Sequence, residues 1–269
     1  MMKTEVRSQG WRVSPILMSV SCAISAVLLG MFVGSARPVM AQDAKDSKIE
    51  ADVHKALDNK QLHNVQASFQ GDNVTLTGTV DLYADKELAD NRVHHVKGVK
   101  GVDNEIQVGG PTVEDAALRD KLAKGLAYDR VGYGTTAFNA ISIGVDHGVV
   151  TLEGTVYWEP DKDSAVGLMA NTPGVKDVID NLKVAPVSPM DDQLRLRLAR
   201  VIYGTPQLQK YALDPAKPIR IMVINGNVTL SGVVDSKMDK DIAGLKANSV
   251  PGIFKVVNDL QVAGPESGK

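Results

Sequence analysis

The chain has little of what most sites of chemistry require. Its 269 residues contain a single cysteine, Cys22, and aromatic side chains make up only 4% of the sequence. One cysteine forms no internal disulfide and no zinc site of several thiolates. Few aromatic residues and a net charge of −2 argue against base stacking and against a field that attracts nucleic acid. We therefore expect no nucleic-acid partner.

The motifs of common enzymes and metal sites are absent as well. The five histidines show no HExxH or Cys/His spacing, and no G-x-S-x-G elbow occurs. His94 and His95 are adjacent, and adjacent helical residues point about 100° apart, so the pair is not expected to share a metal ion. The Gly132-Tyr133-Gly134 stretch lacks the third glycine and the Gly-Lys-Ser/Thr ending of phosphate-binding loops. We predict no catalytic residue, no metal and no cofactor.

The first 41 residues differ from the rest. Lys3, Arg7 and Arg12 precede a stretch without charge, residues 16–36, and small or apolar residues lead to Ala41. This order is typical of a secretory signal peptide. The uncharged stretch would also be long enough for an uncleaved inner-membrane anchor. Either alternative exports residues 42–269, because basic residues favour an N-terminus inside, and we expect a periplasmic location.

Residues 42–269 contain one sequence unit three times. Its landmarks are a V-T-L-x-G strand, a Gly-Val or Gly-Ile pair and a closing strand of alternating apolar residues, spaced by 76 and then 78 residues. The copies begin at Val74, Val150 and Val228 for the first landmark, and at Gly98, Gly174 and Gly252 for the second. Such a register indicates tandem small domains. We place a first module at 42–110, a second at 111–187 and a third at 188–269.

Each module is predicted to have the order α-β-β-α-β. Helices are expected at 49–59, 114–126 and 192–202, and again near 85–97, 163–171 and 238–249. An alternating strand, a tight turn at Gly71, Gly148 or Asn225-Gly226, and a second strand lie between each pair of helices. The fold class is therefore α+β, with a three-stranded mixed sheet covered on one face by two helices.

Six glycines are expected to be structural. Gly78, Gly154 and Gly232 lie on the apolar side of the second strand, where we expect a covering helix to approach closely. Gly98, Gly174 and Gly252 are expected to end the second helix of each module. Acidic residues near the start of the first helices are expected to favour the helix dipole.

The V-T-L-x-G strand, the Gly-Val helix end and the closing V-x-N-x-[IL]-x-V strand resemble the BON domain. The resemblance covers nearly all of residues 47–263. One departure is Asp180, where the other copies have Asn104 and Asn258. The resemblance implies an envelope location, binding to phospholipid or a membrane surface, and no catalysis; it names no catalytic residue.

Only the third module is basic. Residues 42–110 carry 8 basic and 12 acidic residues, and residues 111–190 carry 7 and 11, so each segment has a net charge of −4. Residues 191–269 carry 11 and 8, a net charge of +3. Within that module, Leu194, Leu198 and Val201 are predicted to face the core, while Leu196, Arg200 and Tyr203 share another face beside Arg197. An exposed leucine, a tyrosine and two arginines suit an anionic lipid surface; the alternative is that Leu196 and Tyr203 pack against the neighbouring module.

Two long connections follow the first helices of the second and third modules, at 129–139 and 204–218. Long ordered loops are often functional, so these segments could contact lipid or a partner, or could pack between modules. The leading functional hypothesis is a phospholipid-surface protein that supports envelope integrity under osmotic stress. The alternative is an interaction or chaperone-like scaffold for exported or outer-membrane proteins.

Overall fold

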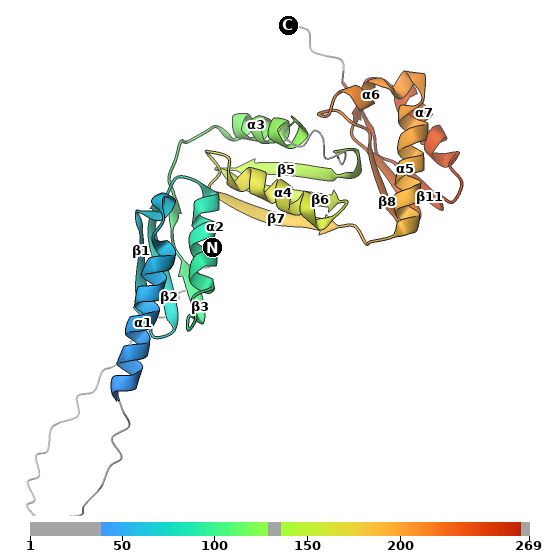
Figure 1. Cartoon of the computed structure of the whole chain (residues 1–269). Helices are drawn as coiled ribbons and strands as arrows, with labels where there is room; N and C mark the ends of the chain where they lie inside the picture. The colour runs from blue at the N-terminus through green and yellow to red at the C-terminus, as the bar shows by residue number, and fades with distance from the viewer. Residues whose placement is uncertain (1–38, 129–135, 265–269) are drawn as a thin grey trace, which may run out of the picture. The chain divides into compact units, whose positions relative to one another are not determined.

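A computed structural model describes residues 39–128 and 136–264. The first module contains two helices, α1 and α2, and a mixed sheet with a short 3-10 turn before it (Figure 1). Its elements are α1 (Val39–Leu57), η1 (Lys60–Leu62), β1 (Val65–Gln70), β2 (Asn73–Val80), α2 (Tyr83–His94), β3 (Gly101–Asn104) and β4 (Gln107–Val108). Of the signal peptide or anchor predicted at 1–41, residues 1–38 lie outside the described part of the structure. No described helix is long and apolar enough to cross a membrane.

The second and third modules repeat this order. The second consists of α3 (Asp115–Tyr128), η2 (Thr136–Phe138), β5 (Ala140–Asp146), β6 (Val149–Val156), α4 (Glu159–Ala170) and β7 (Asp177–Val184). The third consists of α5 (Pro189–Tyr203), η3 (Pro206–Leu208), α6 (Lys210–Leu213), β8 (Arg220–Ile224), β9 (Asn227–Ser231), β10 (Val233–Val234), α7 (Lys237–Asn248), β11 (Lys255–Asn258) and β12 (Gln261–Val262).

The main sheet of each module has the same topology. The first two long strands form an antiparallel hairpin, and the last strand pairs in parallel with the second strand, which is therefore central. A parallel return requires a crossover, and the second helix of each module supplies it. The predicted α+β class and the three mixed sheets are confirmed.

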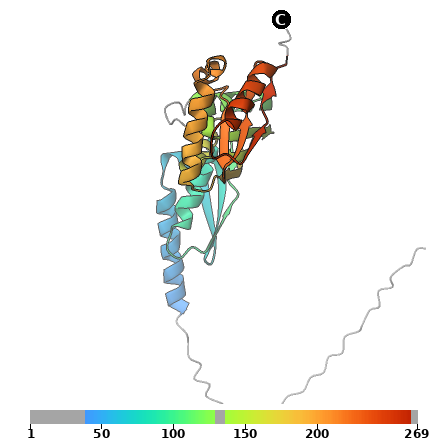
Figure 2. The ribbon, with the colours of Figure 1, turned by 90° about the vertical axis from the view of Figure 1, so that its right-hand side faces the viewer.

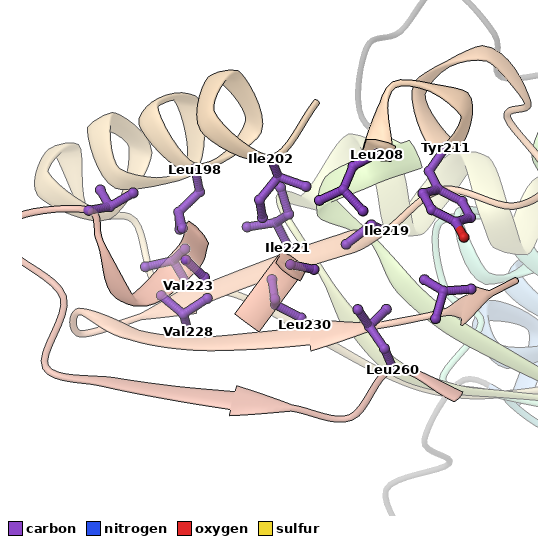
Figure 3. Packing of buried hydrophobic residues seen from close by; sticks show 14 of the residues in the cluster. Leu198, Ile202, Leu208, Tyr211, Ile219, Ile221, Val223, Val228, Leu230 and Leu260 are labelled. Carbon is purple, nitrogen blue, oxygen red and sulfur yellow. The ribbon is translucent and has the colours of Figure 1, made fainter. Parts of the chain in front are cut away.

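The apolar alternation of the central strand places its side chains in the core. Val74, Leu76 and Val80 are almost fully buried, as are their counterparts in β6, β9 and β10. In the third module, Leu198 and Ile202 of α5 point onto strand residues such as Ile221 and Leu230 (Figure 3). Helix α7 lies beside α5 on the same sheet (Figure 2). Each sheet thus buries one face beneath two helices, as its period-2 pattern predicts.

The glycines of the central strands have a different role from the one expected. Gly78, Gly154 and Gly232 have φ values of +116°, +122° and +124°, which L-residues with a side chain rarely adopt. A Cβ atom at each position would meet a backbone carbonyl oxygen at the start of the neighbouring hairpin strand or up to two residues before it, namely that of Asn64, Ala140 or Pro218. The backbone of the neighbouring strand therefore approaches these glycines closely. The prediction that a covering helix does so was wrong.

The glycines expected to end the second helices lie four residues beyond the last helical residue. Gly98, Gly174 and Gly252 have φ values of +110°, +103° and +93°. A side chain at Gly98 would press on Ile49 of α1, one at Gly174 on Val113, and one at Gly252 would contact Leu194 of α5. These glycines thus turn the chain where it passes beneath the start of the first helix.

An acidic residue joins the first helix to the hairpin in two modules. The Asp191 carboxylate accepts hydrogen bonds from the backbone N–H groups of Asn225 and Gly226, at 2.8 and 2.9 Å. Asp115 accepts from His147 and Gly148 in the same way, at 2.8 and 3.0 Å. These acids therefore have a specific role in addition to any effect of the helix dipole.

The departure at Asp180 has a simple explanation. Asn104 and Asn258 each donate a side-chain N–H to a helix carbonyl, that of Lys86 or Lys240. Asp180 has no such donor, and its Oδ2 instead pairs with Lys162 Nζ at 2.9 Å. All three side chains still accept the backbone N–H two residues later. An ion pair in the second module thus replaces an amide–carbonyl hydrogen bond.

Candidate functional site

The face of α5 that enters the core differs by one residue from the prediction. Leu194, Leu198 and Ile202 are buried, at positions i, i+4 and i+8, whereas Val201 is only partly buried. Arg195 is also buried, with 2% of its surface exposed. Its Nη2 donates to the Val223 carbonyl at 2.6 Å and its Nη1 contacts Asp192 at 2.5 Å. Arg195 was not among the residues predicted to lie in the core.

Tyr203 does not belong to an exposed surface. Its hydroxyl donates to the carbonyl oxygen of Ile219 at 2.6 Å, and its ring packs against the core of its own module. Burial raises the pKa of the Tyr203 hydroxyl well above its ordinary value. The Tyr203 side chain therefore has no free hydroxyl to offer a lipid surface, and Tyr203 does not belong to the candidate surface.

Leu196, Arg197 and Arg200 remain on the outer face of α5. Leu196 is 59% exposed, and both arginines are exposed. The one hydrogen bond of these arginines among the described residues joins Arg197 Nη2 to Gln193 Oε1 at 3.5 Å. Their charges are therefore available to an external anion.

Helix α7 extends this surface, although no pattern used to predict it pointed to α7. A shallow groove between α5 and α7 is lined by Arg200 and Val201 on one side and by Ile242 and Lys246 on the other. Met238 and Leu245, four residues before and three after Ile242, are 68% and 72% exposed. The signal in the sequence was the seven-residue spacing of these two apolar residues, which places both on one helix face.

We call this surface the basic helix face. It combines exposed apolar side chains with cations that have no ion pair among the described residues. Its members are Leu196, Arg197 and Arg200 of α5 and Met238, Ile242, Leu245 and Lys246 of α7. The nearby Asp241 is neutralised by Lys237, whose Nζ lies 2.7 Å from its Oδ2. The face is therefore both cationic and partly apolar.

The other modules differ at the matching positions. Ile49, Leu118 and Leu194 occupy equivalent places beneath the first helix, because each lies at or near the glycine that follows the second helix. Counting from them, Arg200 matches Lys55 and Lys124, Arg197 matches Asp52 and Lys121, and Leu196 matches Ala51 and Asp120. The combination of an apolar residue with two cations therefore occurs only in the third module.

The histidines do not form a metal centre by themselves. Among the described residues, the one group of three possible ligands is Asp115, Asp146 and His147, whose ligand atoms lie within 4.8 Å of one another. His147 and Asp146 are exposed, and both oxygens of Asp115 already accept backbone hydrogen bonds. His94 Nδ1 lies 3.3 Å from Asp90, and His95 Nδ1 lies 2.6 Å from the Asn91 carbonyl.

Comparison with known proteins identifies the repeated module. A sequence profile described as the BON domain matches residues 45–110, 114–186 and 206–264. The third match begins after α5. This helix is therefore assigned to the third module by its packing alone. Osmotically-inducible protein Y of Escherichia coli (strain K12) is 28% identical over 163 residues, which cover 60% of this chain and 78% of that protein.

Two solved structures show a more distant similarity. CdsD, a structural protein of the type III secretion system of Chlamydia trachomatis, has 17% identity and a TM-score of 0.23, covering 81% of this chain and 94% of that chain. The periplasmic domain of PrgH, a type III secretion inner-membrane protein of S. typhimurium, has 11% identity and a TM-score of 0.20, covering 80% and 100%. TM-scores this far below 0.5 support no inference about this chain.

Proposed function

Because this chain belongs to the BON-domain family, with three matches along its length, we propose that it is a non-enzymatic envelope protein whose third module binds anionic phospholipid surfaces. The observation that carries the proposal is the basic helix face. Exposed leucine and methionine side chains beside unpaired arginine and lysine are the combination that amphipathic helices use at an anionic membrane surface.

The proposed location is the periplasm, which the predicted leader and the similarity to an osmotically inducible protein support. A surface protein there would support envelope integrity under osmotic stress. The sequence contains no motif of an enzyme or cofactor site, and this absence motivates the non-enzymatic assignment. A stoichiometric transition metal in the native protein would contradict it.

The test is flotation of residues 42–269 with vesicles of phosphatidylcholine, with and without phosphatidylglycerol. Near an anionic membrane each Lys or Arg is worth roughly 1 kcal/mol. The double substitution Arg197→Glu and Arg200→Glu removes two attractions and adds two repulsions. We expect binding to weaken by on the order of a hundredfold or more at low salt, and by less where salt shortens the screening length.

The matched control is Lys55→Glu, which reverses the charge at the position of α1 equivalent to Arg200. It is exposed and lies in an acidic module, so it should change binding little. Circular dichroism should show that both variants fold, because Arg197 and Arg200 are exposed. A folded double variant that keeps the vesicle affinity of the parent would refute the basic helix face as the binding surface.

Protein docking is the second candidate function. Phe254 and Leu213 are large apolar side chains of the third module that are 76% and 82% exposed and lie outside the basic helix face. Apolar docking of an exported or outer-membrane protein would be insensitive to salt. Binding that survives high salt, ignores anionic lipid and depends on Phe254 would favour this alternative.

A further inference from the structure

A cavity of about 400 Å³ lies beside helix α3 and strand β5, and it is separate from the basic helix face. Helix α3 and strand β5 form most of its wall, with apolar side chains that include Leu126, Ile141 and Ile143. Thr136 and Asn139 come from the described part of the first connection, and Pro215 and Ala216 from the second. The volume is within the range of small-molecule sites, roughly 300–1,000 Å³.

The polar side chains around this cavity are mostly cationic. Arg119, Lys124 and Arg220 line it, against a single carboxylate, Asp120, which lies 3.6 Å from Arg119. Among the described residues, Arg220 has neither a hydrogen bond nor an ion pair, although its side chain is partly buried. Burial lowers the pKa of Arg220, and the interaction with Tyr203 opposes this shift.

A desolvated guanidinium without an anion is unfavourable, because a buried charge requires a partner of opposite sign. Asn139 adds a further polar group to the wall: its side-chain oxygen accepts the N–H of Tyr157 at 2.7 Å, and its NH₂ group has no partner among the described residues. Among the described residues, the cavity thus presents an unpaired amide donor, Asn139, and two cations without an ion pair, Lys124 and Arg220, beside an apolar wall.

The second connection is anchored where it borders the cavity. The hydroxyl of Tyr128, at the end of α3, donates to Asp214 Oδ1 at 3.1 Å, and Asp214 Oδ1 also accepts the N–H of Ala216 at 2.9 Å. The hydrogen bond to the Asp214 carboxylate raises the pKa of Tyr128. The wall that carries Pro215 and Ala216 is therefore held in place.

We propose that this cavity binds a small amphiphilic anion, with a carboxylate or phosphate head at Arg220 and an apolar body against α3 and β5. Neither a simple inorganic anion nor an uncharged hydrocarbon uses both halves of the lining. A cationic amphiphile would be repelled, because its head group would lie beside Arg119, Lys124 and Arg220.

Isothermal titration of residues 42–269 with decanoate, below its micellar concentration, tests the proposal. We expect saturable binding of one decanoate per chain, with no comparable binding of acetate, decanol or decyltrimethylammonium. Decyl phosphate should bind at the same site and compete with decanoate. Arg220→Gln should weaken decanoate binding about ten- to hundredfold, the usual value of a hydrogen bond to a charged group.

Ala123→Phe provides a second variant that does not remove a partly buried charge. Ala123 is an exposed residue of α3 that lines the cavity, so a phenyl ring there fills the space without disturbing the core. Decanoate binding should be lost. Ala51→Phe places the same ring on an exposed alanine of α1 outside the cavity and should leave binding unchanged.

The proposals for the cavity and for the basic helix face can be refuted independently of each other. The Arg197→Glu and Arg200→Glu double variant should bind decanoate like the parent, and Ala123→Phe should float with anionic vesicles like the parent. Equal binding of decanol and decanoate, or decanoate binding that Ala123→Phe leaves unchanged, would overturn the proposed site. Absence of decanoate and decyl phosphate binding to the parent would overturn it as well.

Discussion

At the scale of single residues, buried acids link elements that are distant in the sequence. Asp191 is 2% exposed, and its two oxygens accept both N–H groups of the turn between β8 and β9. Asn225 and Gly226 need these acceptors because the turn holds both at positive φ, +50° and +73°, with N–H groups that no strand partner takes. One carboxylate therefore fixes the start of α5 against the hairpin.

Asp191→Asn should weaken this link, because a carboxamide has one acceptor oxygen and no charge. We expect the third module to lose about 1.5–3 kcal/mol, the usual worth of a hydrogen bond to a charged group. Hydrogen exchange followed by mass spectrometry should show faster exchange in a peptide containing residues 220–230. Asp46→Asn is the control: Asp46 is the equivalent residue of α1, but its Oδ1 has no hydrogen bond, so the change should be small.

At the scale of elements, the long connection after α5 is part of the core of its module. Leu208 of η3 and Tyr211 of α6 are 0% and 4% exposed and belong to the same cluster as α5 and the strands (Figure 3). The Tyr211 hydroxyl donates to Asp239 of α7 and accepts the N–H of Asp235, each at 2.7 Å. The connection thus fastens the start of α7 to the rest of the module.

This contact should make the third module sensitive to acid. Burial alone would raise the pKa of Asp239, but hydrogen bonds from Tyr211, Lys210 and Ser236 hold it below its ordinary value of 3.8. A lowered folded-state pKa stabilises the fold above 3.8, and this contribution is lost as the pH falls through the folded-state pKa. The equivalent Asp85 in α2 has the opposite shift, because burial raises its pKa, so its contribution is present below 3.8 and is lost as the pH rises.

Lowering the pH from 6 to about 3 should therefore destabilise the third module relative to the first. Exchange rates corrected for intrinsic pH dependence, compared between peptides of α7 and α2, measure this difference. Tyr211→Phe removes one stabilising hydrogen bond, so it should destabilise the third module at pH 6 and reduce the further loss on acidification. An equal loss at both pH values would show that the contribution of the Tyr211 hydroxyl does not depend on the ionisation of Asp239.

At the scale of the whole chain, charge is divided among the modules. The chain has a net charge of −2, but the third module is net positive and the other two are net negative. A uniformly basic protein would be drawn to any anionic surface, whereas here attraction is expected from one module only. This division is what makes a matched control in the first module informative.

Export of residues 42–269 is also predicted at this scale. The basic start and uncharged stretch of residues 1–41 are expected to direct export and then to be removed after Ala41. The intact mass of the protein purified from the envelope should correspond to residues 42–269. A mass that includes residues 1–41 would instead support an uncleaved inner-membrane anchor, with residues 42–269 still outside the cytoplasm.

The repeat, the α-β-β-α-β order, the hairpin turns and the buried side of each central strand were predictable from the sequence, because periodicity and turn chemistry act between near neighbours. The exposure of Leu196, Arg197 and Arg200 followed from the same helical spacing, with an error of one residue at Val201. Tertiary structure alone decided that Tyr203 points to Ile219, that α7 completes the basic helix face, and that strand backbone crowds Gly78. It alone brought Arg220 to the cavity beside α3. Each of these contacts joins residues far apart along the chain, and their pairing depends on how the helices and strands pack, which no local pattern contains.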